Sequence, residues 1–150
     1  MRPTLLSTIK EVFSELIPFN RVVGARIESI KENCPSVRFD MRPELIGNYF
    51  RGTLHGGVIS TILDATGGLT AFLGAQEKLE DEDSQARIDQ FAKLGTIDLR
   101  IDYLRPGLGR WFIATGHILR TGNKIAVARV ELHNDKNELI AVGTGAYVIA

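Results

Sequence analysis

The sequence has very little cysteine, and its positive and negative charges balance. Cys34 is the single cysteine among 150 residues, which excludes a disulfide framework within the chain and a zinc site built from several cysteines. A reducing cytoplasm is therefore the expected compartment. Lysine plus arginine number 18, as do aspartate plus glutamate. The net charge of zero argues against a dedicated nucleic-acid binder, which usually carries a basic excess.

Long apolar runs are also missing. No stretch of about 18 consecutive apolar residues occurs, so no membrane span is expected. Lys10 and Glu11 interrupt the start of the chain before a signal-peptide core could build, and no targeting segment is expected. His117 and His133 have no cysteine or carboxylate partner at metal-ligand spacing, so we expect neither a metal nor a cofactor. The length fits one domain over residues 1–150.

What the sequence does contain is a clear succession of hydrophobic periodicities. Apolar residues at helical spacing near the start end at Pro18, which closes a predicted helix. The segments predicted for the first part of the chain are a helix at 4–16, two strands within 22–41, a loop at 42–54, a long helix at 56–75 and an acidic insertion, either an exposed helix or a mobile excursion, at 77–93.

Strand patterns dominate the rest of the chain. From Thr96 onward, apolar and polar residues alternate up to Tyr103, which predicts a strand with one buried face. Turn residues separate three further predicted strands, at 111–120, 124–133 and 138–149, so these form an antiparallel meander. The fold class is therefore α+β, with an antiparallel sheet of five to six strands wrapped around one long central helix.

The central helix has two unlike faces. At about 100° per residue, one face is broadly apolar and packs on a sheet. The opposite face carries only small residues around one carboxylate, Asp64, and has no lysine, arginine or glutamate. Because a solvent-facing surface normally carries such charges, we expect this face to be covered closely by a second subunit or a ligand. The face consists of Gly57, Ser60, Thr61, Asp64, Gly67, Gly68 and Ala71.

The start of this helix offers free backbone N–H groups. Gly56 and Gly57 would let a substrate approach them, and oriented N–H groups stabilise an oxyanion that develops on a thioester carbonyl. Asp64 lies seven residues after Gly57, about 10 Å along the helix axis, which suggests a site completed by a second subunit. Read without any other information, Asp64 could also be a polar packing contact, His55 a turn residue, and the glycines packing devices.

Three segments together resemble a known family. They are Asn48-Tyr49-Phe50-Arg51-Gly52-Thr53-Leu54-His55-Gly56-Gly57, with Asp64 nine residues after His55; Gly95–Pro106; and Arg120–Ala126. They closely resemble the PaaI-like hotdog thioesterases. Residue by residue, these segments are most similar to the YigI-type subgroup, which is associated with medium- and long-chain acyl-CoA. The resemblance covers roughly residues 20–149 and implies a hotdog fold and hydrolysis of acyl-CoA to free fatty acid and coenzyme A.

The resemblance also implies roles for individual residues. Asp64 would act as the nucleophile or as the general base for water, and the N–H of Gly56, with Gly57, would polarise the thioester carbonyl. His55 and Asn48 would support the carbonyl or the loop, and Thr96 would orient the attacking water. The spacing between Asn48 and His55 is one residue longer than in relatives in which this asparagine is catalytic, because Arg51 is inserted.

Enzymes of this type work as homodimers or as homotetramers that are dimers of dimers, with sites shared between subunits. Coenzyme A carries phosphates, for which basic side chains are the expected partners. The candidates are Arg105, Arg120, Asn123, Lys124 and Arg51. Two alternatives stay open: a hotdog dehydratase acting on hydroxyacyl chains, and an acyl-CoA-binding module without catalysis.

Overall fold

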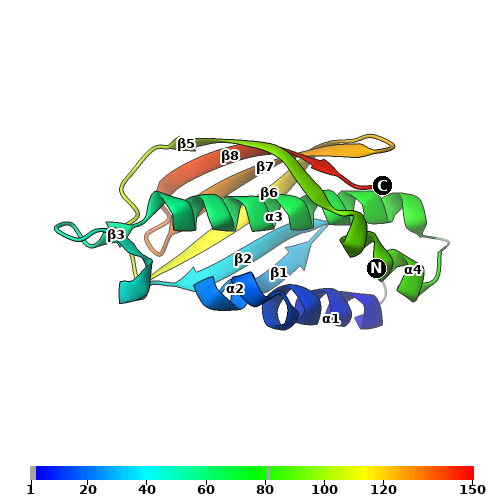
Figure 1. Ribbon diagram of the computed structural model, residues 1–150, viewed down its shortest axis with the longest axis horizontal. Helices are drawn as coiled ribbons and strands as arrows, with labels where there is room; N and C mark the ends of the chain where they lie inside the picture. The colour runs from blue at the N-terminus through cyan, green and yellow to red at the C-terminus, as the bar shows by residue number, and fades with distance from the viewer. Residues whose placement is uncertain (1–2, 81) are drawn as a thin grey trace.

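A computed structural model describes residues 3–80 and 82–150, and its centre is a six-stranded antiparallel sheet in the order β1-β2-β6-β7-β8-β5. The strands are β1 (Arg26–Lys31), β2 (Cys34–Asp40), β5 (Gly95–Tyr103), β6 (Trp111–Thr121), β7 (Ile125–Asn134) and β8 (Leu139–Val148). Helix α3 (Gly56–Gln76) lies across one face of the sheet and contacts β2, β5, β6, β7 and β8 (Figure 1). The predicted α+β architecture is confirmed, as is the meander formed by β6, β7 and β8.

Helix α3 supplies the middle of the hydrophobic core. Ile62, Leu63, Leu69, Phe72 and Leu73 are each at most 1% exposed, and they pack against apolar side chains from the inner face of the sheet. The span Gly56–Leu79 is long and apolar enough to cross a membrane, but 72% of its most apolar window is buried inside the protein. Burial under the sheet accounts for its composition.

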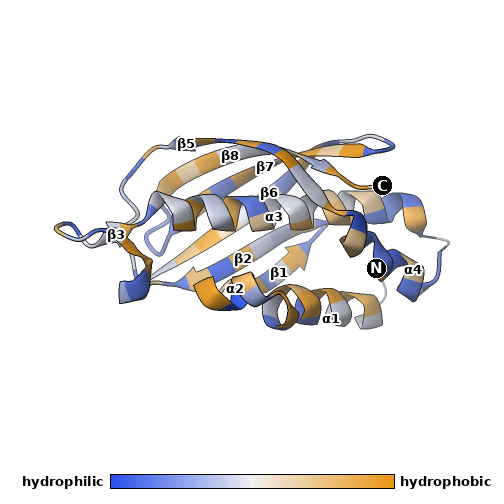
Figure 2. Ribbon diagram, viewed as in Figure 1, coloured by the Kyte–Doolittle hydropathy of each residue, from blue (hydrophilic) through white to orange (hydrophobic). Residues whose placement is uncertain are grey.

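The N-terminal segment differs from the prediction of a single helix. Helix α1 (Pro3–Glu11) passes into a π-helical turn (Val12–Leu16), in which the Ile17 N–H donates to the Val12 carbonyl. Pro18 then begins a second helix, α2 (Pro18–Val23), as proline does readily at a first helical position. Orange segments of α1 and α2 lie alongside the inner side of the sheet in Figure 2.

One further segment differs from prediction, and the acidic insertion follows one of its two predicted alternatives, a helix. The predicted loop 42–54 contains a 3₁₀ turn and a small hairpin of β3 (Ile46–Asn48) and β4 (Thr53–Leu54). The acidic insertion contains helix α4 (Ser84–Asp89) between two 3₁₀ turns. It is anchored to the end of α3, because Arg87 Nε donates to Gln76 Oε1 at 3.0 Å and Gln76 Nε2 donates to the Arg87 carbonyl at 3.3 Å.

Strand β5 forms one edge of the sheet and pairs on one side only, with β8. Its predicted buried face is only partly buried, because Ile97 and Tyr103 are 51% and 54% exposed. The opposite edge strand, β1, is partly covered by the N-terminal segment, whose Ser14 hydroxyl accepts a hydrogen bond from the Ile27 N–H at 3.1 Å. The edge available for strand pairing is therefore β5.

Candidate active site

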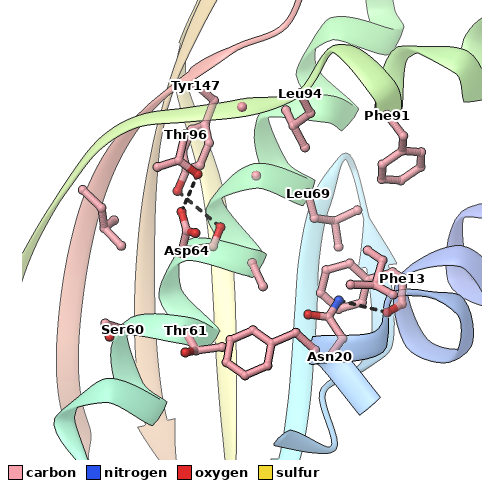
Figure 3. A pocket seen from close by; sticks show the side chains of 16 residues that line it. Phe13, Asn20, Ser60, Thr61, Asp64, Leu69, Phe91, Leu94, Thr96 and Tyr147 are labelled. Carbon is pink, nitrogen blue, oxygen red and sulfur yellow. Dashed lines mark hydrogen bonds between the residues drawn. The ribbon is translucent and has the colours of Figure 1, made fainter. Parts of the chain in front are cut away.

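Asp64 and Thr96 meet although 32 residues separate them. Asp64 lies in the middle of α3 and is partly buried, and Thr96 lies at the start of β5. The Thr96 hydroxyl donates to Asp64 Oδ1 at 2.9 Å (Figure 3). This bond occupies one carboxylate oxygen and favours one rotamer of Asp64, which also lines the cavity described below.

Tyr147, on β8, is a neighbour of Asp64 that the sequence did not single out. Its side chain is 1% exposed, and its hydroxyl donates to the backbone carbonyl of Asp64 at 3.4 Å (Figure 3). Burial raises the pKa of the Tyr147 phenol well above its usual range, and the negative charge of Asp64 adds to the shift. The phenol therefore stays protonated next to the carboxylate. Only a packed structure reveals it, since a tyrosine in an alternating strand has the pattern of an ordinary core residue.

The Tyr147 hydroxyl explains two of the glycines. A Cβ on Gly67 would overlap that hydroxyl, and a Cβ on Gly145 would lie 2.6 Å from it. Gly67 and Gly68 are buried by Tyr147 and Leu94 of the same chain. The expectation that a second subunit or a ligand covers the whole small-residue face is therefore wrong at Gly67, which Tyr147 covers, whereas Gly68 also lines the cavity described below.

The N-terminal end of α3 is held by His55. The residue is the N-cap, and its Nδ1 accepts a hydrogen bond from the Gly57 N–H at 2.7 Å. Accepting at Nδ1 places the proton of a neutral ring on Nε2, which leaves that N–H as a free donor. Gly56 is the first residue of the helix and is exposed, so its own N–H has no acceptor within the helix.

Asn48 forms its hydrogen bonds within its own hairpin. Its side-chain oxygen accepts from the Arg51 N–H at 3.2 Å, and its carbonyl accepts from the Gly52 N–H at 2.8 Å. The tip of this hairpin carries Tyr49 and Phe50, which are 87% and 94% exposed. Asn48 thus shapes the loop that leads to His55, and the tip projects away from the sheet on the β3 side (Figure 1).

Within one chain, the expected nucleophile or base, Asp64, lies far from the expected oxyanion donor, the Gly56 N–H. Asp64 follows Gly56 by eight residues, which is about 12 Å along the helix axis. A reacting carbonyl has to lie roughly 3 Å from both the attacking group and the oxyanion donor. One copy of the chain therefore brings together Asp64, Thr96 and Tyr147, but it leaves Gly56 and His55 outside that cluster.

The five candidate phosphate-binding residues fall into two groups at opposite ends of α3. Arg105 follows Tyr103, whose ring approaches Gly56, and Arg51 lies in the adjacent hairpin. The turn that contains Asn123, with Arg120 and Lys124 beside it, lies near the C-terminal end of α3, where Lys78 donates to the Gly122 carbonyl at 2.7 Å. Within the described part of the chain, none of the four cations has an ion-pair partner.

A cavity of about 590 Å³ opens beside the Asp64–Thr96 pair. Most of the polar side chains gather around Asp64, and the far side is mainly apolar, with Asn20 beside Phe13 (Figure 3). The polar end holds Ser60, Thr61, Asp64, Thr96 and Tyr147, and the apolar lining includes Phe13, Ile17, Leu69, Phe91 and Leu94. No cluster of three possible metal ligands occurs among residues 3–80 and 82–150.

Comparisons with known proteins agree with this geometry. The sequence model of the thioesterase superfamily matches residues 51–141. The chain is 41% identical over 147 residues to the medium/long-chain acyl-CoA thioesterase YigI of Escherichia coli K12, which spans 96% of this chain and 93% of that protein. A crystal structure of a Shewanella oneidensis protein related to the thioesterase superfamily superposes with a TM-score of 0.93 at 42% identity, over 100% of both chains.

More distant structures share the fold alone. The PaaI protein of Escherichia coli, from the phenylacetic acid degradation operon, superposes with a TM-score of 0.75 at 18% identity over 98% of this chain and 94% of that chain. The fold and the site define the class of hotdog thioester hydrolases. The chain belongs to the thioesterase superfamily, and the resemblance to PaaI-like and YigI-type members is confirmed.

Proposed function

We propose that this protein, as a single hotdog domain acting in the cytoplasm, hydrolyses medium- to long-chain acyl-CoA to free fatty acid and coenzyme A. The observation that carries the proposal is the Asp64–Thr96 pair on the polar side of a largely apolar cavity. A carboxylate held at the mouth of an apolar pocket suits a substrate with a polar reacting group and an apolar tail. The 41% identity to YigI supports the same substrate class.

In the proposed reaction, an oxygen attacks the thioester carbonyl and the C–S bond breaks. Asp64 takes the proton of the attacking water, or it attacks directly and forms an anhydride that water then hydrolyses. In both routes the carbonyl oxygen becomes an oxyanion, and the thiolate of coenzyme A leaves and is protonated. A single turnover in water labelled with heavy oxygen tests for the anhydride. Label found in Asp64 would show direct attack followed by attack of water at the aspartyl carbonyl, whereas general-base catalysis puts label into the fatty acid and none into Asp64.

The oxyanion donor in this proposal comes from a second subunit. Along β5, Thr96 contacts Asp64 and Tyr103 contacts Gly56. Antiparallel pairing of two β5 edges around a twofold axis near Leu99 would set Thr96 opposite the partner subunit's Tyr103. The same operation would bring the partner subunit's Gly56 to Asp64, which removes the separation of about 12 Å found within one chain. A homodimer, alone or as half of a tetramer, therefore supplies two complete sites.

Coenzyme A would be held by the exposed basic residues at the two ends of α3. In the proposed dimer, Arg51 and Arg105 of one subunit and the Arg120–Lys124 turn of the other flank the same site. Replacing Lys124 or Arg105 with glutamine should raise KM and leave kcat nearly unchanged, because a phosphate contact remote from the reacting carbonyl is made equally in the ground state and the transition state.

The test is a thiol-release assay over a series of acyl-CoA chain lengths, with an aromatic acyl-CoA included. We expect release from medium and long chains, and its near loss in Asp64→Asn, which should still fold and bind acyl-CoA. A 2-enoyl product from a hydroxyacyl-CoA would support a dehydratase instead. Binding of acyl-CoA without any thiol release by the wild-type protein would indicate a binding module and overturn the proposal.

A further inference from the structure

The apolar end of the cavity is built from three segments that lie far apart in the sequence. Leu69 comes from α3, Phe13 comes from the π-helical turn, and Phe91 and Leu94 come from the segment between α4 and β5. These side chains lie opposite Asp64 across the cavity in Figure 3. An apolar chain whose thioester reached Asp64 would therefore run towards Phe13 and Phe91.

Phe13 is a fixed part of this wall. Its side chain is 3% exposed. Phe13 lies in the π-helical turn, and its carbonyl accepts a hydrogen bond at 2.9 Å from Nδ2 of Asn20, a residue of α2 that is 5% exposed. Ser14, the next residue, accepts from the Ile27 N–H on β1 at 3.1 Å. The turn is thus tied to α2 on one side and to the sheet on the other.

Phe91 is fixed from the other side. Its ring stacks on Phe72 of α3, with the centroids 3.9 Å apart and the planes 18° from parallel. The preceding helix, α4, is bound to the end of α3 through the reciprocal hydrogen bonds between Arg87 and Gln76. Because side chains packed in this way do not move aside without losing contacts, the wall limits how far an apolar chain can extend.

We propose that Phe91 and Phe13 form the end wall of an acyl-chain site and set the longest straight acyl chain that the enzyme accepts. The proposal rests on the proposed acyl-CoA hydrolysis and names the residues that determine its substrate range. Methylenes that fit before the wall each add binding energy, and methylenes beyond it add none or have to leave the cavity.

The test uses alkyl-CoA thioethers, in which the missing carbonyl prevents hydrolysis, in a series of straight chains lengthened by two carbons at a time. In the wild-type protein, Kd measured by titration calorimetry should tighten by about fourfold per methylene and then level off at a limiting length. In Phe91→Ala the levelling should occur at least two carbons later, with a gain of roughly 15-fold for the longer chains. Phe91→Leu should give a smaller shift in the same direction and keeps the site apolar if the alanine variant folds poorly.

The matched control is Leu16→Ala. Leu16 belongs to the same π-helical turn as Phe13, but its side chain is 59% exposed and does not line the cavity. Its replacement should therefore leave the length profile unchanged. A limiting length that stays the same in both Phe91 variants, or that moves equally in Leu16→Ala, would overturn the end-wall proposal. Length-dependent thioether binding by a wild-type protein that releases no thiol from acyl-CoA would support the wall and overturn the proposed hydrolysis, so the two failures are distinguishable.

Discussion

At the scale of single residues, the hydrogen bond from Thr96 to Asp64 is the contact most directly tied to chemistry. In Thr96→Val the shape is kept but the donor is lost, and a hydrogen bond to a charged group contributes about 1.5–3 kcal/mol. We expect kcat to fall by roughly 10- to 100-fold while KM changes little, as measured in the thiol-release assay. Thr96→Ser keeps the hydroxyl and should retain most activity; equal losses in both variants would argue against this role.

Tyr147 makes a separate prediction about pH. Its pKa in the folded protein lies above the unfolded value of 10.0, so the folded state keeps a proton that the unfolded chain releases. The contribution to stability is complete below pH 10 and is lost as pH rises towards the folded pKa, at about 1.4 kcal/mol per pH unit. The free energy of unfolding should therefore fall more steeply above pH 10 for the wild-type protein than for Tyr147→Phe.

Urea denaturation of the two proteins at several pH values above and below 10 measures this difference. All other titrating groups are common to both proteins and cancel in the comparison. Parallel pH profiles would show that the Tyr147 phenol ionises as easily in the folded protein as in the unfolded chain.

At the scale of elements, the first residue of α3 allows a clean test of the oxyanion donor. Proline is well tolerated at a first helical position, and the residue before it, His55, already has the extended backbone (φ −61°, ψ 135°) that proline requires. Gly56→Pro therefore removes one N–H and little else. We expect kcat to fall by about 10²–10³-fold with a normal thermal midpoint, because the loss of one oxyanion donor has an effect of that size.

Gly56→Ala serves as the control for that variant, since it keeps the N–H and its Cβ would meet Tyr103 at an ordinary distance of 3.5 Å. Nearly full activity in Gly56→Pro would exclude this N–H as the donor and leave the free Nε2–H of His55 as the remaining candidate.

Sequence reasoning was strongest for elements with long, regular patterns. The central helix and the four C-terminal strands were placed within a residue or two, because 3.6-residue and two-residue periods repeat several times in them. Helix α2 is not predictable in this way, because a six-residue helix that begins with a proline carries too little periodicity to be recognised. The family resemblance alone implies that Asp64 and Thr96 serve the same reaction, with Thr96 orienting the attacking water, and it does not predict their direct hydrogen bond. Tyr147, and the wall made by Phe13 and Phe91, depend on packing between distant segments, which no local pattern encodes.

At the scale of the whole molecule, the open edge of β5 predicts self-association. Ile97 is 51% exposed on that edge, and a lysine there should oppose strand pairing without disturbing the fold. If the proposed dimer forms through this edge, Ile97→Lys should shift the sedimentation profile towards the monomer in analytical ultracentrifugation and lower the specific activity most strongly at low protein concentration. Leu119→Lys changes a side chain that is 57% exposed on β6, away from this edge, and should do neither.

The distance between Asp64 and Gly56 along one helix has a consequence for mixtures of defective chains. If each centre takes its carboxylate from one copy and its N–H from the other, inactive Asp64→Asn and inactive Gly56→Pro proteins should restore activity to each other when their subunits exchange. Half of the randomly reassembled pairs would be mixed, and each mixed pair would have one intact centre and one doubly defective centre. Recovered activity would then approach about one quarter of the wild-type value. Chains that worked independently would recover none, so the geometry of a single helix predicts complementation between two mutant alleles.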